Sequence, residues 1–160
     1  MDWKTTIWQQ YGAAIDMLEN AMRACPDDVW PECWYIAYHT LFFLDFYLSE
    51  SAEGFAPPAP FTLDELDPAG ILPERPFTKD ELLTYLDHGR RKCYATIQAM
   101  TEEQADQRCG FERPEVTRAE LLLYNMRHVQ HHTGQLNLLL RQRTDSAAPR
   151  WVAKASPIPR

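Results

Sequence analysis

Residues 117–142 read TRAELLLYNMRHVQHHTGQLNLLLRQ, and this stretch indicates the fold. Thr117 is followed three residues later by Glu120, which is the signature of a capping box at the start of a helix. Leucines then recur at helical spacing as far as about Gln142. The stretch therefore predicts one long helix, of the length that spans a small helical domain.

Two histidines of this helix share its apolar side. His128 and His132 are four residues apart, so their side chains lie about 40° apart on the helical wheel. Leu121 and Leu139 fall in the same sector and indicate that it faces the core. Two imidazoles one turn apart can chelate one metal ion. His131 points about 60° to the other side of His128, at the rim of this face.

Three other stretches repeat apolar residues at spacings of three and four, and these are residues 7–25, 33–49 and 78–100. The second is apolar nearly all round, which predicts the most buried helix. The third begins with Thr78 and Glu81, a second capping-box signature. No strand-like alternation of useful length is present, so the sequence predicts an all-α fold with four helices.

A proline-rich connection separates the second and third predicted helices. Residues 51–77 contain six prolines and cannot form a long helix. So long a connection fits a four-helix bundle with one long crossover. We expect one bundle domain over residues 1–143, crossover included, and a C-terminal tail over residues 144–160. The tail is expected to be frayed or anchored by Trp151 and Val152.

The composition limits the class of protein. The 160 residues carry a formal net charge of −7, which disfavours nucleic-acid binding because that usually needs a concentrated basic face. No apolar run approaches a membrane span of about 20 residues, and the N-terminus lacks a signal-peptide pattern. The cysteines form no C-x-x-C pair and are expected to be mostly buried apolar residues; they are Cys25, Cys33, Cys93 and Cys109. A cytoplasmic location is the simplest expectation.

A third metal ligand would have to come from another helix. His39 lies among aromatic residues of the second predicted helix, where a lone histidine is more often a hydrogen-bonded core residue. Burying it together with His128 and His132 without partners would cost several kcal/mol, about 1–3 per unsatisfied polar group. One ion would satisfy all three, and protons would then compete with it, so affinity should fall steeply below about pH 6. The alternative is a solvated histidine-rich face.

Other polar residues could support such a site. Asn125 and Gln135 share the inward sector and could orient a ligand or a bound water, although hydrogen bonding at the edge of the core explains them equally well. His88 lies off the apolar stripe of the third helix and is expected at the surface. Arg127 also lies outside the ligand sector and is interpreted as a surface or interface charge.

The sequence resembles the DinB/YfiT-like family of metalloenzymes. The resemblance is carried by Tyr38-His39-Thr40-Leu41-Phe42-Phe43 and by His128-Val129-Gln130-His131-His132-Thr133-Gly134-Gln135, and it covers residues 7–143. It implies a four-helix bundle of up-down-down-up topology. It also implies that His39, His128 and His132 are the metal ligands and that His131 lies just outside them.

The resemblance also implies an activity. Three histidine ligands leave a coordination position open, as in catalytic sites, and the family includes transferases that use low-molecular-weight thiols. We therefore expect a metal-dependent transferase or hydrolase acting on a small electrophile, with a low-molecular-weight thiol as the cosubstrate. The ion would be zinc or nickel, or else iron. A homodimer is expected. The competing hypothesis is a non-catalytic, stress-related binding module with a structural metal.

Overall fold

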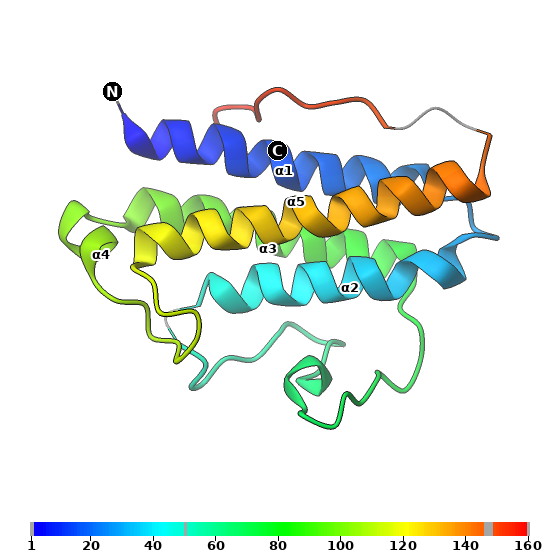
Figure 1. The fold of residues 1–160 in the computed structure, drawn as a ribbon, viewed down its shortest axis with the longest axis horizontal. Coiled ribbons are helices and arrows are strands. Elements are labelled where there is room, and N and C mark those ends of the chain that lie inside the picture. Colours follow the sequence, from blue (N-terminus) through cyan, green and yellow to red (C-terminus); the bar gives the residue numbers. More distant parts are fainter. Residues whose placement is uncertain (1, 50, 146–148, 160) are drawn as a thin grey trace.

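The computed structural model describes residues 2–49, 51–145 and 149–159. Four long helices follow a common axis (Figure 1): α1 Trp3–Ala24, α2 Trp30–Tyr47, α3 Lys79–Ala99 and α5 Arg118–Arg143. Two short elements complete the fold, the 3-10 helix η1 Asp64–Leu66 and the helix α4 Glu102–Asp106. The described residues form isolated bridges but no strand, so the predicted all-α class is confirmed. None of their helices has the length and apolar character that crossing a membrane requires.

The four long helices pack as a bundle around one apolar core. α5 and α3 each contact both α1 and α2, whereas α1 and α2 lie diagonally opposite and touch only slightly. Buried residues occur on several sides of α2, at Ala37–Tyr38, Thr40–Phe42 and Leu44–Phe46. This matches the apolar character all round that its sequence shows. The α2–α5 contact brings together the two helices that carry the predicted ligands.

Side-chain caps mark the start of every described α-helix except α2, which has proline in its first turn instead. The capping boxes predicted at Thr78 and Thr117 are both formed, each with its glutamate three residues on. Thr101 forms a third with Gln104 and begins α4, a short helix that the periodicity of the sequence did not predict. α1 begins earlier than expected, because Asp2 caps it by accepting a hydrogen bond from the Lys4 amide.

A buried carboxylate connects α2 to α3. Asp45 is 1% exposed and accepts hydrogen bonds from Tyr85 (3.0 Å) and from the Lys92 ammonium (2.5 Å). His88 is exposed, as expected, and its Nε2 lies 3.4 Å from Asp45 Oδ1. A paired carboxylate is tolerated inside a protein when its charge and lone pairs are satisfied. This cluster therefore fastens the side of α2 that faces away from α5.

The long connection between α2 and α3 lies along the outside of the bundle (Figure 1). Two of its aromatic residues, Phe61 and Phe77, are buried against the bundle. Phe61 stacks on Tyr85 of α3 with ring centroids 4.2 Å apart. Its aliphatic residues stay exposed, and these are Leu63, Leu66, Ile71 and Leu72. Two aromatic anchors thus fix a segment that has almost no regular secondary structure.

The described part of the C-terminal tail runs along α1 (Figure 1). The Ala155 amide donates to the Gln9 carbonyl, and the Trp8 indole donates to the Ser156 carbonyl. A Cβ placed on Gly12 would lie 2.7 Å from the Ala155 Cβ, so only glycine lets the tail approach this closely. The anchor is therefore Ala155, whereas Trp151 is 70% exposed.

We predict that Phe61→Ala destabilises the protein by about 3 kcal/mol, because truncating a buried phenylalanine removes apolar burial and leaves a cavity. Leu72→Ala, in the same connection but 56% exposed, is the matched control and should cost less than about 0.5 kcal/mol. Urea unfolding of both variants measures the difference. Equal stabilities would show that the connection does not contribute to the core.

Candidate metal centre

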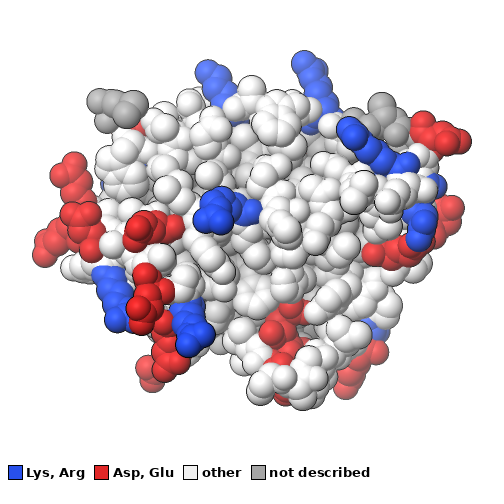
Figure 2. Space-filling view, viewed as in Figure 1, with Lys and Arg blue, Asp and Glu red and all other residues white. Residues whose placement is uncertain are grey.

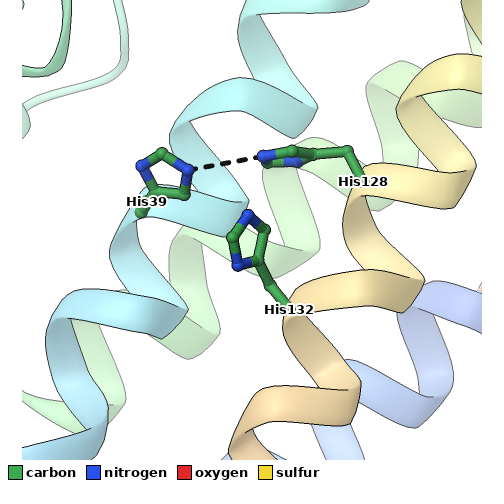
Figure 3. Close-up of side chains that lie close together, drawn as sticks. All are labelled: His39, His128 and His132. Atoms are coloured by element: carbon green, nitrogen blue, oxygen red, sulfur yellow. Dashed lines mark hydrogen bonds between the residues drawn. The ribbon is translucent and has the colours of Figure 1, made fainter.

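Three histidine rings converge between α2 and α5. His39 comes from the middle of α2, and His128 and His132 come from successive turns of α5 (Figure 3). One ring nitrogen from each lies within 4.8 Å of the others, and the Nε2 atoms of His39 and His128 are 3.4 Å apart. The three side chains that the sequence singled out are therefore brought together as a group that could hold a metal ion.

The register between the two helices produces this convergence. Val129 and Thr133 are fully buried, so the side of α5 that carries them faces the core. Asn125, also buried, donates from Nδ2 to the Leu44 carbonyl of α2 at 3.0 Å. This hydrogen bond fixes α5 against α2 one turn away from His128. Histidines at i and i+4 of α5 then present their rings to the same stretch of α2.

Two of the three rings are oriented by oxygen acceptors. His39 Nδ1 lies 2.7 Å from Glu65 Oε2, and His132 Nδ1 lies 2.6 Å from Gln135 Oε1. A carboxylate and an amide oxygen accept hydrogen bonds, so both Nδ1 atoms carry the proton. The lone pair of each neutral ring is then on Nε2. Outer partners of this kind commonly set the tautomer of metal-binding histidines.

The two histidine rings of α5 favour the neutral form. Burial, reinforced by the neighbouring imidazoles of His132, His39 and His131, lowers the pKa of His128 to about 3. Burial also lowers the pKa of His132, although its hydrogen bond to Gln135 acts in the opposite direction. Only a neutral imidazole has a lone pair to offer a metal ion. Both α5 rings are therefore in the ligand form at neutral pH.

One pair of the three nitrogens already has the spacing that a divalent ion requires. Two nitrogens of a tetrahedral site with Zn–N bonds near 2.0–2.1 Å would lie about 3.4 Å apart. The His39 and His128 Nε2 atoms are separated by this distance. His128 Nδ1 is buried and has no hydrogen-bond partner within the described part of the chain. An ion between the rings would replace the hydrogen bond between the His39 and His128 Nε2 atoms and would take a lone pair from each.

The other predicted residues contribute differently. Gln135 contacts a ring of the trio, because its Oε1 lies 2.6 Å from His132 Nδ1. Asn125 bonds the backbone of α2, and its Oδ1 is buried without a partner among the described residues. His131 is exposed, with its ring centroid 4.9 Å from that of His132. It therefore lies beside the trio.

Sequence reasoning missed Glu65. This residue lies in η1 of the crossover, and its side chain is only 3% exposed although it carries a carboxylate. Burial, and then the charge of Glu65, raise the pKa of the neighbouring Tyr35. Several acidic residues of the crossover could have reached α2, and the sequence has no periodicity there that distinguishes Glu65. The only available signal was the expectation that a histidine ligand has an outer acceptor.

Aromatic rings and an open cavity border the trio. The Phe43 ring lies 4.9 Å from His39 and 5.6 Å from His128, measured between centroids. A surface cavity of about 450 Å³ opens beside His128 and is lined also by Tyr124, Arg127, Gln130 and His131. A larger cavity of about 720 Å³, between the start of the crossover and α3, includes none of the three histidines. The cavity of about 450 Å³ is therefore the one that borders the histidine trio.

We predict that Glu65→Gln lowers metal affinity about tenfold to hundredfold, because the His39 ring loses the carboxylate that accepts its Nδ1 proton. Asp64→Asn is the matched control, since Asp64 lies in the same short helix but accepts a hydrogen bond from Thr62. Competition with a chromophoric chelator at pH 7.5 measures both affinities. Equal losses in the two variants would assign the effect to disruption of the crossover.

Burial of the rings changes the expectation of a steep loss of affinity below about pH 6, because the pH dependence should be weaker than that of free histidines. Protons compete with the metal below the pKa of each ring, and the lowered pKa of His128, about 3, leaves this ring unprotonated at pH 5.5. Three unperturbed imidazoles, with pKa about 6.5, would lose roughly thousandfold in affinity at pH 5.5. We expect a clearly smaller loss between pH 7.5 and 5.5 in chelator competition. A full thousandfold loss with the fold intact would contradict the neutral, buried site.

Comparison with known proteins identifies the family of the chain. The family model of the DinB superfamily matches residues 4–136, which include all four long helices except Trp3 of α1 and the last turns of α5. No match was found among curated proteins or among solved structures. The matched range contains His39, His128 and His132 as well as Glu65 and Gln135. The chain belongs to the DinB superfamily.

Proposed function

We propose that this protein binds one divalent metal ion through His39, His128 and His132 and is a metal-dependent transferase or hydrolase. Its substrate is a small electrophile, and a low-molecular-weight thiol is the cosubstrate of the transfer reaction. The observation that carries the proposal is the convergence of three ring nitrogens, with two of the rings held in the ligand tautomer by Glu65 and Gln135. Zinc or nickel suits three imidazole ligands best, and iron is the third candidate.

A bound ion would supply Lewis acidity, which lowers the pKa of a thiol or polarises an electrophile. Side chains of the protein would orient the ligands and bind the substrate. Glu65 holds the proton on His39 Nδ1, and the ring of Phe43 covers the apolar side of the trio. The cavity beside His128 gives a small molecule access, and Arg127 at its edge can pair with an anionic group of the substrate.

Partial exposure of the trio supports catalysis over a purely structural metal. The His39 side chain is 28% exposed, and His132 is also only partly buried. A structural site is normally closed by four protein ligands, whereas three ligands leave room for substrate. The apolar core between the four helices is extensive without the trio. The fold therefore has its own source of stability.

The organisation of the chain belongs to the same proposal. We propose an up-down-down-up order for α1, α2, α3 and α5, and the path of the crossover along the outside of the bundle supports it (Figure 1). We also propose that residues 1–143 form one domain and that the protein is a homodimer.

The face that carries α2 and α5 has few charged side chains across its middle (Figure 2), which favours a small partner over a nucleic acid.

The test begins with elemental analysis of protein purified without a histidine tag. Turnover is then measured with monobromobimane and a panel of low-molecular-weight thiols, and hydrolysis is followed with activated esters. We expect stoichiometric metal and turnover that chelator abolishes. His128→Ala should lose both the metal and at least about 99% of the turnover, because one of three ligands is gone.

His88→Ala is the matched control, because His88 lies on α3 and contacts Asp45, away from the trio. It should keep both metal and turnover. Stoichiometric metal without turnover above that of His128→Ala would support the structural role of the ion. Equal metal content in His128→Ala and the parent would exclude the three-histidine site.

A further inference from the structure

A pair of cysteines lies at the turn between α1 and α2. Cys25 caps the C-terminus of α1, and Cys33 lies in the first turns of α2. Their Sγ atoms are 3.0 Å apart, and the residues are 2% and 0% exposed. Non-bonded heavy atoms usually stay about 3.5–4.0 Å apart, whereas a disulfide bond is about 2.05 Å long. The two sulfurs therefore already face each other at close contact.

The backbone around the pair is held on both sides. The Trp30 amide donates to the Pro26 carbonyl at 2.9 Å and shapes the turn. Lys79, from the start of α3, donates to the Cys25 carbonyl at 2.7 Å and pairs with Asp27 at 2.8 Å. The Trp30 indole donates to the Phe77 carbonyl at 3.0 Å. Two thiols held together by a fixed turn have a high effective concentration toward each other.

We propose that Cys25 and Cys33 are a dithiol site that a low-molecular-weight disulfide oxidises to an intramolecular disulfide. The Cys25 thiol loses its proton to solvent, and its sulfur attacks the small disulfide, which releases one small thiol and leaves a mixed disulfide. The Cys33 sulfur, after losing its proton, then attacks Cys25 Sγ and releases the second small thiol. Two protein thiols are oxidised by two electrons, and one small disulfide is reduced to two thiols.

Burial sets the rate of this exchange. It raises the pKa of both thiols, so little thiolate is present at neutral pH while the turn is closed. Cys25 directly precedes the exposed residues 26–28 and becomes accessible first when the turn opens. The oxidation is therefore slow and must be followed to equilibrium.

The test uses the full-length protein in buffers of reduced and oxidised glutathione, approached from both the reduced and the oxidised side. Intact mass should show the loss of two hydrogen atoms as the buffer becomes more oxidising. Proteolysis after Asp28 or Glu32 cuts between the two cysteines, so a disulfide keeps the two fragments together until reductant is added. Closing so short a loop should raise the melting temperature by about 5–10 °C, reversibly.

Cys33→Ala should show no such shift, whereas Cys93→Ala, which removes another fully buried cysteine, should retain it. Cys25→Ser is the second variant if Cys33→Ala does not fold, and the peptide map of the parent is independent of both. Four free thiols at equilibrium in the most oxidising buffer would overturn the proposal. Disulfides that join other cysteines, or an equal shift in Cys33→Ala, would overturn it as well.

Discussion

The packing of α2 against α5 is the constraint on which the rest of the structure depends. Sliding one helix past the other by a single turn would move His39 by about 5.4 Å, farther than the separation of its Nε2 from that of His128. The hydrogen bond from Asn125 to the Leu44 carbonyl prevents this, since breaking it would leave two buried polar groups unpaired. On its other side, α2 is held by the charge cluster at Asp45. The three rings are thus positioned by the core and not by the site itself.

The protonation states of the site depend on its burial, because the core excludes water from charged groups. Glu65 has a buried side chain whose Oε2 lies 2.7 Å from His39 Nδ1, and its Oε1 has no hydrogen-bond partner among the described residues. Such a group is costly in a protein interior unless a positive charge lies nearby. The lowered pKa values of His128 and His132 show that protons on these rings would not readily supply this charge. A divalent cation between the rings would supply it.

Sequence reasoning succeeded wherever helical periodicity controls geometry. The four long helices, two of their caps and the shared face of His128 and His132 follow from spacing, because a helix fixes the direction of each side chain. The convergence of His39 with this pair is an expectation that the family resemblance implies. Sequence reasoning failed in segments that have no period. Glu65 and the contact of Ala155 with Gly12 depend on the path of irregular chain. The Cys25–Cys33 contact depends on the conformation of one turn.

The origin of Glu65 in the crossover has a consequence for how the site can vary. Helix packing sets the spacing of the three rings, while a segment anchored separately by Phe61 and Phe77 sets the acceptor for His39. The strength of that acceptor controls how much electron density the imidazole donates to an ion. Substitutions in the crossover can therefore adjust the electronic properties of the centre while the helical scaffold stays unaltered. Geometry and ligand basicity are encoded in different parts of the chain.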